Sequence, residues 1–135
     1  MEGAKVLKNE IIIFEDVDIR LEVKVQDETV WLTQNQMAQL FQTTVPNVNL
    51  YLKNIFDEGE LKEIATIKDF LIVRQEGKRQ VKRNLAFYNL DAIISVGYRI
   101  KSYAATLFRI WATKVLKGVS PAFSTKPPLS VFSFP

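Results

Sequence analysis

The chain has 135 residues, of which 47% are hydrophobic, and this composition suits one globular domain with a sizeable core. It contains no Cys and no His, which excludes disulfides, thiolate zinc sites, imidazole bases and His-containing catalytic triads. The five Gly residues are scattered, so no phosphate-binding loop or dinucleotide fingerprint is present. We therefore expect a protein that is not an enzyme and that uses no cofactor or metal. The net charge of +3 is by itself weak evidence for nucleic-acid binding, and the distribution of the charges along the chain is more informative.

The chain ends and apolar runs bear on localisation. Residues 1–9 are polar and are expected to be a flexible N-terminus without the apolar core of a signal peptide. The apolar runs are far shorter than the roughly 18 residues that a membrane-spanning helix needs. We therefore expect a cytoplasmic protein without membrane contact.

Residues 10–32 have the pattern of a small antiparallel β-meander. A β-branched run at 10–14 is followed by strict alternation of apolar and charged residues, in which the apolar positions are Ile19, Leu21, Val23 and Val25. Such alternation indicates a strand with one buried face. Asp16 and Asp18 supply the first turn, residues 26–28 supply the second, and 29–32 form a third strand that contains Trp31, an expected core residue.

Residues 33–56 read as two short helices separated by a tight polar turn. Thr33 and Gln36 have the spacing of a capping box, and Thr44 is a good cap for the second helix, which has Pro46 in its first turn. A buried stripe then follows the spacing of three and four residues, at Val45, Val48, Leu52, Ile55 and Phe56. This layout is typical of a helix-turn-helix, whose second helix enters the major groove of DNA.

The outward face of the second helix carries the candidate base-reading residues. An Asn amide can donate to and accept from the edge of adenine, and an exposed Leu can contact a thymine methyl group. The expected set is Asn47, Leu50, Tyr51 and Asn54. The alternative is an ordinary helical hairpin with a solvated polar face.

Residues 69–88 are expected to form a β-hairpin with a basic tip, after an irregular helical turn within 60–68. Between positions 74 and 83, five cations minus one acid (Glu76) give a local charge of +4, the cations being Arg74, Lys78, Arg79, Lys82 and Arg83. A basic hairpin after a helix-turn-helix is typical of a winged helix, in which the wing contacts phosphates. The alternative is a charged hairpin that protects an edge strand from aggregation. The candidate phosphate-binding residues are Gln34, Thr43, Thr44, Lys53, Lys78, Arg79, Lys82 and Arg83.

Two helices are predicted after the hairpin, one from 90 to about 98, capped by Asn89, and one from Ser102 to about Lys117. The second is apolar over more than one stripe, so it is either enclosed within the domain or in contact with a partner. Because a domain this small has limited room to surround a helix, we expect residues 102–117 to form a homodimer or partner-protein interface anchored by Phe108 and Trp111. Residues 118–135 are rich in Pro and Phe and are expected to be a tail without regular structure. The predicted fold is therefore an α+β winged helix-turn-helix domain over 10–117, with an N-terminal antiparallel β-meander and two C-terminal helices.

Four segments resemble the N-terminal region of the bacterial RhuM-type virulence-associated proteins. They are DETVWLTQNQMAQLF (27–41), NVNLYLKNIFDEGEL (47–61), FYNLDAIISVGYRI (87–100) and FRIWATKVL (108–116). The resemblance implies a DNA-binding-like module of phage or mobile-element character. The last segment is also similar to parts of phage antirepressor domains.

The sequence departs from that family in two places. Family members usually have Gly where this chain has Gln42, and a left-handed conformation costs a non-Gly residue roughly 1–2 kcal/mol. Family members also continue with a further helical region, some with a Fic-like domain, whereas here the resemblance stops near Lys117. The absence of His excludes a Fic-type active site.

These observations predict a DNA-binding protein of phage or mobile-element type, acting on double-stranded DNA as a transcriptional regulator. The second interpretation is a protein-interaction module, like an antirepressor, whose C-terminal helix binds a partner protein.

Overall fold

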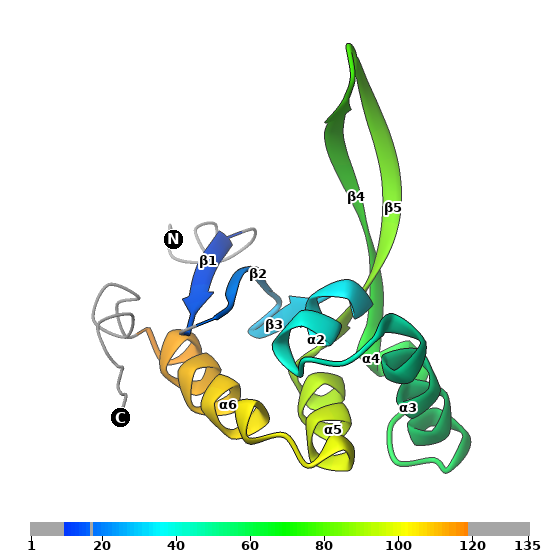
Figure 1. Cartoon of the computed structure of the whole chain (residues 1–135), viewed down its shortest axis with the longest axis vertical. Coiled ribbons are helices and arrows are strands. Elements are labelled where there is room, and N and C mark those ends of the chain that lie inside the picture. The colour runs from blue at the N-terminus through cyan, green and yellow to red at the C-terminus, as the bar shows by residue number, and fades with distance from the viewer. Residues whose placement is uncertain (1–9, 17, 119–135) are drawn as a thin grey trace.

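The computed structural model describes residues 10–16 and 18–118, and over these it confirms the α+β class, the N-terminal antiparallel meander and the two C-terminal helices. The expected flexible N-terminus (1–9) and the tail beyond Gly118 lie outside the described residues. The strands form one sheet in the order β1-β2-β3-β5-β4, with bounds β1 Glu10–Glu15, β2 Arg20–Gln26, β3 Thr29–Leu32, β4 Ile67–Glu76 and β5 Arg79–Asn89. The helices are α2 Gln34–Leu40, α3 Val45–Asp57, α4 Glu63–Thr66, α5 Leu90–Ile100 and α6 Tyr103–Leu116 (Figure 1).

One face of the sheet is buried, as the alternating pattern of β2 predicts. Leu21, Val23 and Val25 are buried, while the intervening residues of β2 are exposed or half-buried. Phe14 of β1 lies opposite Leu21 and packs edge-on against Phe108 of α6, with ring centroids 5.2 Å apart. The core therefore lies between this sheet face and the helices.

The connection between α2 and α3 is held by local hydrogen bonds. The predicted capping box is present, since Thr33 Oγ1 accepts from the Gln36 backbone N–H and Gln36 Oε1 accepts from that of Thr33. At the end of α2, the N–H groups of Gln42 and Thr43 donate to the carbonyls of Gln39 and Ala38, a Schellman motif. Gln42 accordingly has a φ of +54°, in the left-handed region that favours Gly.

Gly97 allows three helices to meet. A Cβ atom at this position would lie 2.4 Å from Cβ of Ala105 in α6 and 2.9 Å from the ring of Phe41, the C-cap of α2. No real side chain tolerates such distances, so the closeness of α5, α6 and the end of α2 depends on the missing methyl group. Gly97 does not end its helix, which runs two residues beyond the expected Tyr98 and stops where Lys101 adopts a φ of +63°.

Strands β4 and β5 form an arm that projects from the rest of the fold (Figure 1). Their pairing is continuous from Ile67↔Tyr88 to Glu76↔Arg79, and Gly77, at a φ of +64°, begins the two-residue turn. At the root of the arm, the ring of Phe70 packs edge-on against Trp31 of β3 and Phe87 of β5, with centroids 5.8 and 5.1 Å apart. Toward the tip the arm is held by its own pairing, since β5 has β3 as a neighbour only at its root.

No helix among the described residues is long and apolar enough to cross a membrane.

We predict that Gln42→Gly raises the free energy of unfolding by about 1 kcal/mol, because Gly adopts the left-handed conformation without steric cost. Urea denaturation followed by circular dichroism measures the change. The matched control is Gln39→Gly, in regular helical conformation, which should instead lower stability by up to about 1 kcal/mol. A Gln42→Gly variant that is less stable than the original chain would contradict the assigned strain.

Candidate nucleic-acid interface

The face of α3 that points away from the core carries three of the four candidate base-reading residues. Val48, Leu52 and Ile55 are buried, and Leu50, roughly opposite them on the helix, is 52% exposed. Asn47 is exposed and Asn54 half-buried on the same side, whereas Tyr51 leans toward the core and packs against it. The helix therefore presents an amide–leucine–amide surface, with Tyr51 at its margin.

The N-terminal end of α3 is ordered by the two threonines of the turn. Thr44 Oγ1 accepts from the backbone N–H of Asn47 at 3.2 Å, and Thr43 Oγ1 accepts from Asn47 Nδ2 at 3.1 Å. Both threonines were expected to contact phosphate, and each hydroxyl still has its own proton to donate. They lie at the positive end of a 13-residue helix, where an anion is stabilised by the helix dipole.

Gln34 connects three elements instead of projecting freely from α2. Its Nε2 donates to the hydroxyl of Tyr88 in β5 at 3.0 Å and to Oδ1 of Asn49 in α3 at 3.3 Å. A side-chain amide has two N–H donors, and both are engaged here. These bonds hold Gln34 between α2, α3 and the sheet, and its phosphate contact stays a prediction.

The C-terminal end of α3 is acidic and is anchored to α5. Arg99 Nη2 donates to Glu58 at 2.7 Å and to Glu60 at 2.8 Å, and Ser95 Oγ donates to Glu60 at 2.8 Å. These hydrogen bonds, that from Arg99 first, hold the pKa of the Glu60 carboxyl below its ordinary value. Lys53, a candidate phosphate ligand, is paired with Asp57 at 2.8 Å, and this hydrogen bond raises the pKa of Lys53.

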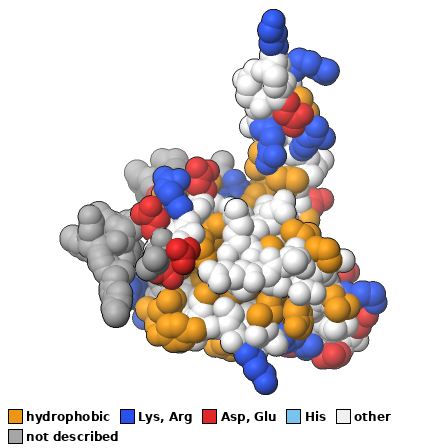
Figure 2. Space-filling view, in the orientation of Figure 1, with side chains coloured by type: hydrophobic (Ala, Val, Ile, Leu, Met, Phe, Trp, Pro, Cys, Tyr) orange, Lys and Arg blue, Asp and Glu red, His pale blue; other side chains and the backbone are white. Residues whose placement is uncertain are grey.

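The cations of the arm are distributed over both of its faces. Side chains alternate along a strand, so Arg83 lies on the face of Ile72, its cross-strand partner, while Lys82 lies on the opposite face with Val73. Arg83 is held by Glu76 through two hydrogen bonds of 3.1 and 3.0 Å, which raise its pKa. Lys78, Arg79 and Lys82 are exposed, and Figure 2 shows Lys and Arg side chains gathered at the tip of the arm.

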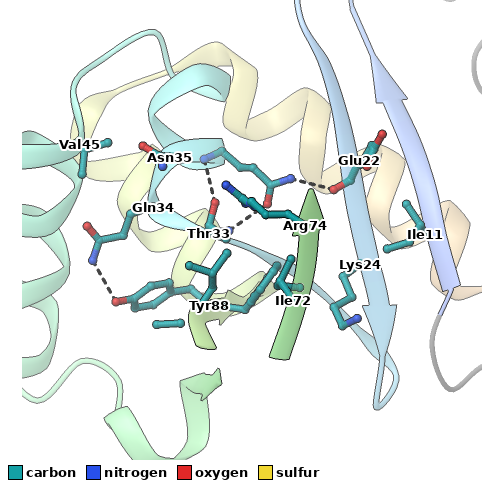
Figure 3. Close-up of a pocket in the computed structure, with 14 residues that line it drawn as sticks. Ile11, Glu22, Lys24, Thr33, Gln34, Asn35, Val45, Ile72, Arg74 and Tyr88 are labelled. Carbon is teal, nitrogen blue, oxygen red and sulfur yellow. Dashed lines mark hydrogen bonds between the residues drawn. The ribbon is translucent and has the colours of Figure 1, made fainter. Parts of the chain in front are cut away.

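A hollow of about 540 Å³ lies between the arm and the start of α2 (Figure 3). Ile72 and Arg74 line it from β4, Thr33 and Gln34 from the start of α2, and Val45 from the first turn of α3. Because one hollow touches both β4 and the N-terminal end of α3, these two parts of the candidate interface lie on the same side of the molecule.

Phe108 and Trp111, the expected anchors of a partner interface, belong to the core. Phe108 has no exposed surface and Trp111 is 6% exposed, and both rings pack against Phe14, with centroids 5.2 and 5.3 Å from it. This corrects the sequence interpretation, because neither ring is on the surface of the described fold. The exposed apolar residues of α6 are Tyr103 and Ile110, on the opposite side of the helix.

The sequence did not predict two residues of the candidate interface. Arg74 was counted in the basic stretch, but its position in the hollow beside α2 was not predicted. That position depends on the register of β4 against β5, which can be inferred only after the turn has been located. Asn49 is exposed and bonded to Gln34 across the two helices. Among residues 10–16 and 18–118, no group of three or more acidic side chains lies close enough together to hold a metal ion.

The family model of the virulence protein RhuM family matches residues 65–121 of the chain. This confirms the resemblance over the arm, α5 and α6, whereas α2 and α3 precede the matched segment. No curated protein and no solved structure matches the chain.

We predict that the contacts of Glu60 make the fold more sensitive to acid. A carboxyl whose folded pKa is lowered adds stability above its unfolded pKa, and this stability is lost as the pH falls through the folded pKa. Glu60→Gln should therefore lower the free energy of unfolding at pH 7 by up to about 1 kcal/mol, because the partly exposed ion pair is screened by solvent. At pH 3 the difference should shrink toward zero.

Urea titrations of both chains at pH 7 and pH 3 measure this difference. Glu63→Gln is the matched control, since Glu63 is exposed on the neighbouring α4. An equal loss for Glu60→Gln at both pH values would contradict an electrostatic origin.

Proposed function

We propose that this chain binds double-stranded DNA as a winged helix-turn-helix and acts as a transcriptional regulator of phage or mobile-element type. In this proposal α2 and α3 are the helix-turn-helix, α3 is the recognition helix, and the arm β4–β5 is the wing. The single observation that carries it is the common hollow, which sets the basic arm on the same side as the N-terminal end of α3.

The distribution of charge selects which part of α3 would face DNA. The helix begins at two threonine hydroxyls and a positive dipole end, whereas its other end is followed by Glu58 and Glu60. Phosphates are attracted to the first end and repelled by the second. We therefore propose that Asn47 and Leu50 in the first half of α3 contact base edges, with Asn54 at the margin of the interface.

The arm has the length and chemistry to follow a DNA groove. From Ile67 to Glu76 the strand rises by about 30 Å, at about 3.4 Å per residue. A two-stranded ribbon fits the major groove, and cations on both of its faces can contact the phosphates of both flanking strands. The exposed cations Lys78, Arg79 and Lys82 would supply these contacts, with Arg74 closer to α2.

A protein-interaction module is the second candidate function, favoured by one observation on α6. Tyr103 is 73% exposed and Ile110 is 41% exposed, and they lie on the same side of the helix at a spacing of seven residues. In this function a partner protein would cover these two residues, and not Phe108 and Trp111. DNA affinity would then be low and insensitive to the arm.

Selection of bound fragments from a random DNA library tests the proposed function. We expect enrichment of a consensus by the original chain, and loss of preference at one or two adjacent positions for Asn47→Ala, because a lost amide–base pair costs about 1–3 kcal/mol of discrimination. Asn84→Ala, an exposed Asn on the arm, is the control and should keep the consensus. A library that yields no bound fragments at low salt would refute the proposal.

We predict that removing three cations of the arm weakens binding mainly at low salt. Log K falls as log salt rises, and each neutralised phosphate contributes about 0.9 to the steepness of this fall. The triple variant Lys78→Ala/Arg79→Ala/Lys82→Ala should therefore make the slope less steep by about 2 to 3. Fluorescence anisotropy over a salt series measures the slope.

The charge-matched control for the arm is Arg109→Ala/Lys114→Ala/Lys117→Ala, which removes the same net charge from exposed positions at and after α6. It should change the slope much less. Equal effects of the two triple variants would show that only net charge matters and would contradict a role for the arm.

A further inference from the structure

The outer edge of β4 is an unpaired strand edge. In the order β1-β2-β3-β5-β4, β4 is the last strand, so one side of its backbone has no strand partner among the described residues. Its middle carries two exposed apolar side chains, Leu71 (58% exposed) and Val73 (53% exposed), on one face of the arm. An exposed edge of this length is a template for pairing with another chain, because it presents a row of unpaired N–H and C=O groups.

The other sheet edge is a weaker candidate. In the strand order of the sheet, β1 forms the opposite edge from β4 (Figure 1). The strand β1 is shorter, with 6 residues against 10 in β4.

We propose that a second copy of this chain pairs antiparallel along β4, with Ile72 opposite Ile72 of the second copy. The resulting dimer has twofold symmetry, so residue i of one copy faces residue 144 − i of the other. The observation that selects this register is the self-complementarity of the sequence KDFLIVRQE from 68 to 76.

Three kinds of cross-strand pair in that register join complementary side chains. Lys68 faces Glu76 of the second copy, Leu71 faces its Val73, and Phe70 faces its Arg74, a cation beside an aromatic ring. Opposite residues of two antiparallel strands point to the same face of the sheet, so the symmetry centre must lie at a residue. Shifting the centre to Leu71 would bring Lys68 opposite Arg74, and these like charges are destabilising. Shifting the centre to Val73 would bring Ile72 opposite Arg74 and Phe70 opposite Glu76, and would lose the pair of Lys68 with Glu76.

The same register also fits the spacing of DNA half-sites, and this one step rests on the proposed function. Ile67 at the root of the arm is five residues from the symmetry centre, so the two roots would be ten residue steps apart. At about 3.4 Å per step this is about 34 Å, close to the roughly 34–36 Å between half-sites on successive turns of DNA. A dimer through β4 would thus suit two recognition helices on one face of a duplex.

Sedimentation equilibrium without DNA tests the pairing, so its outcome is independent of any DNA affinity. We expect a concentration-dependent dimer for the original chain. Leu71→Asp/Val73→Asp should weaken dimerisation at least tenfold, because two like-charged pairs would face each other. Leu71→Lys/Val73→Asp should restore it toward the original value, because the introduced charges would then be opposite. Both positions are exposed, and circular dichroism checks that each variant is folded.

A cysteine variant tests the register directly, since the chain has no Cys of its own. Directly opposite strand residues have Cα atoms about 4.5–5.5 Å apart, within the range of a disulfide. Ile72→Cys should therefore form a covalent dimer on oxidation. Gln75→Cys should not, because the two copies of that position would be about 20 Å apart along the strands.

Three results would overturn the assignment. The first is an original chain that stays monomeric throughout the concentration series. The second is a dimer that survives Leu71→Asp/Val73→Asp but is lost in Tyr103→Lys/Ile110→Lys, which would locate the interface on α6. The third is equal covalent dimer formation by Ile72→Cys and Gln75→Cys.

Discussion

The contact of Gly97 with Ala105 and Phe41 is the constraint on which the arrangement of helices depends. Because Gly97 lacks a side chain, α6 and the end of α2 both pack directly against α5. Phe41 is buried in this junction and is the residue immediately before Gln42. The chain must then reverse direction within a few residues, and the left-handed backbone at Gln42 follows from that requirement. The strain at Gln42 is local, whereas the burial of Phe41 that offsets it comes from residues more than fifty positions away.

The direction of α3 and the position of the arm are linked through a second set of contacts. Gln34 bonds α2 to Asn49 of α3 and to Tyr88 of β5, so the first helix, the second helix and the root of the arm share one polar side chain. On the other face of the sheet, Lys68 lies beside the rings of Trp31 and Phe70 and pairs with Asp27 at 2.5 Å. The root is therefore held from both faces. Beyond it the arm depends on its own ladder and on the Glu76–Arg83 pair.

Much of this fold follows from local signals, and those were readable in the sequence. Capping at Thr33, Thr44, Asn89 and Ser102 and the alternation in β2 act over a few residues, and the elements they predict are present with nearly the expected bounds. Packing between distant parts of the chain was harder to predict from the sequence. The wide apolar surface of α6 was compatible with a partner or with burial, and only the position of Phe14 from the opposite end of the domain decides for burial.

The candidate site shows the same division between local and distant effects. The exposure of Asn47 and Leu50 follows from helical periodicity, so it was predictable. The engagement of Gln34 was not, because its two acceptors are 15 and 54 positions away in the chain. Likewise the basic stretch was visible as a cluster of charge, but its division between two faces and the pairing of Arg83 with Glu76 depend on strand register.

Strand register also links the two uses proposed for the arm. Lys82 and Val73 are cross-strand neighbours on one face, while Arg79 and Arg83 lie on the other with Glu76. Pairing along the β4 edge would use the outer backbone of β4, whereas the cations at the tip come chiefly from the turn and β5. A second copy and a DNA phosphate would therefore meet different sides of the same ribbon. The arm has room for both, because the exposed apolar pair Leu71 and Val73 lies between the anchored root and the charged tip.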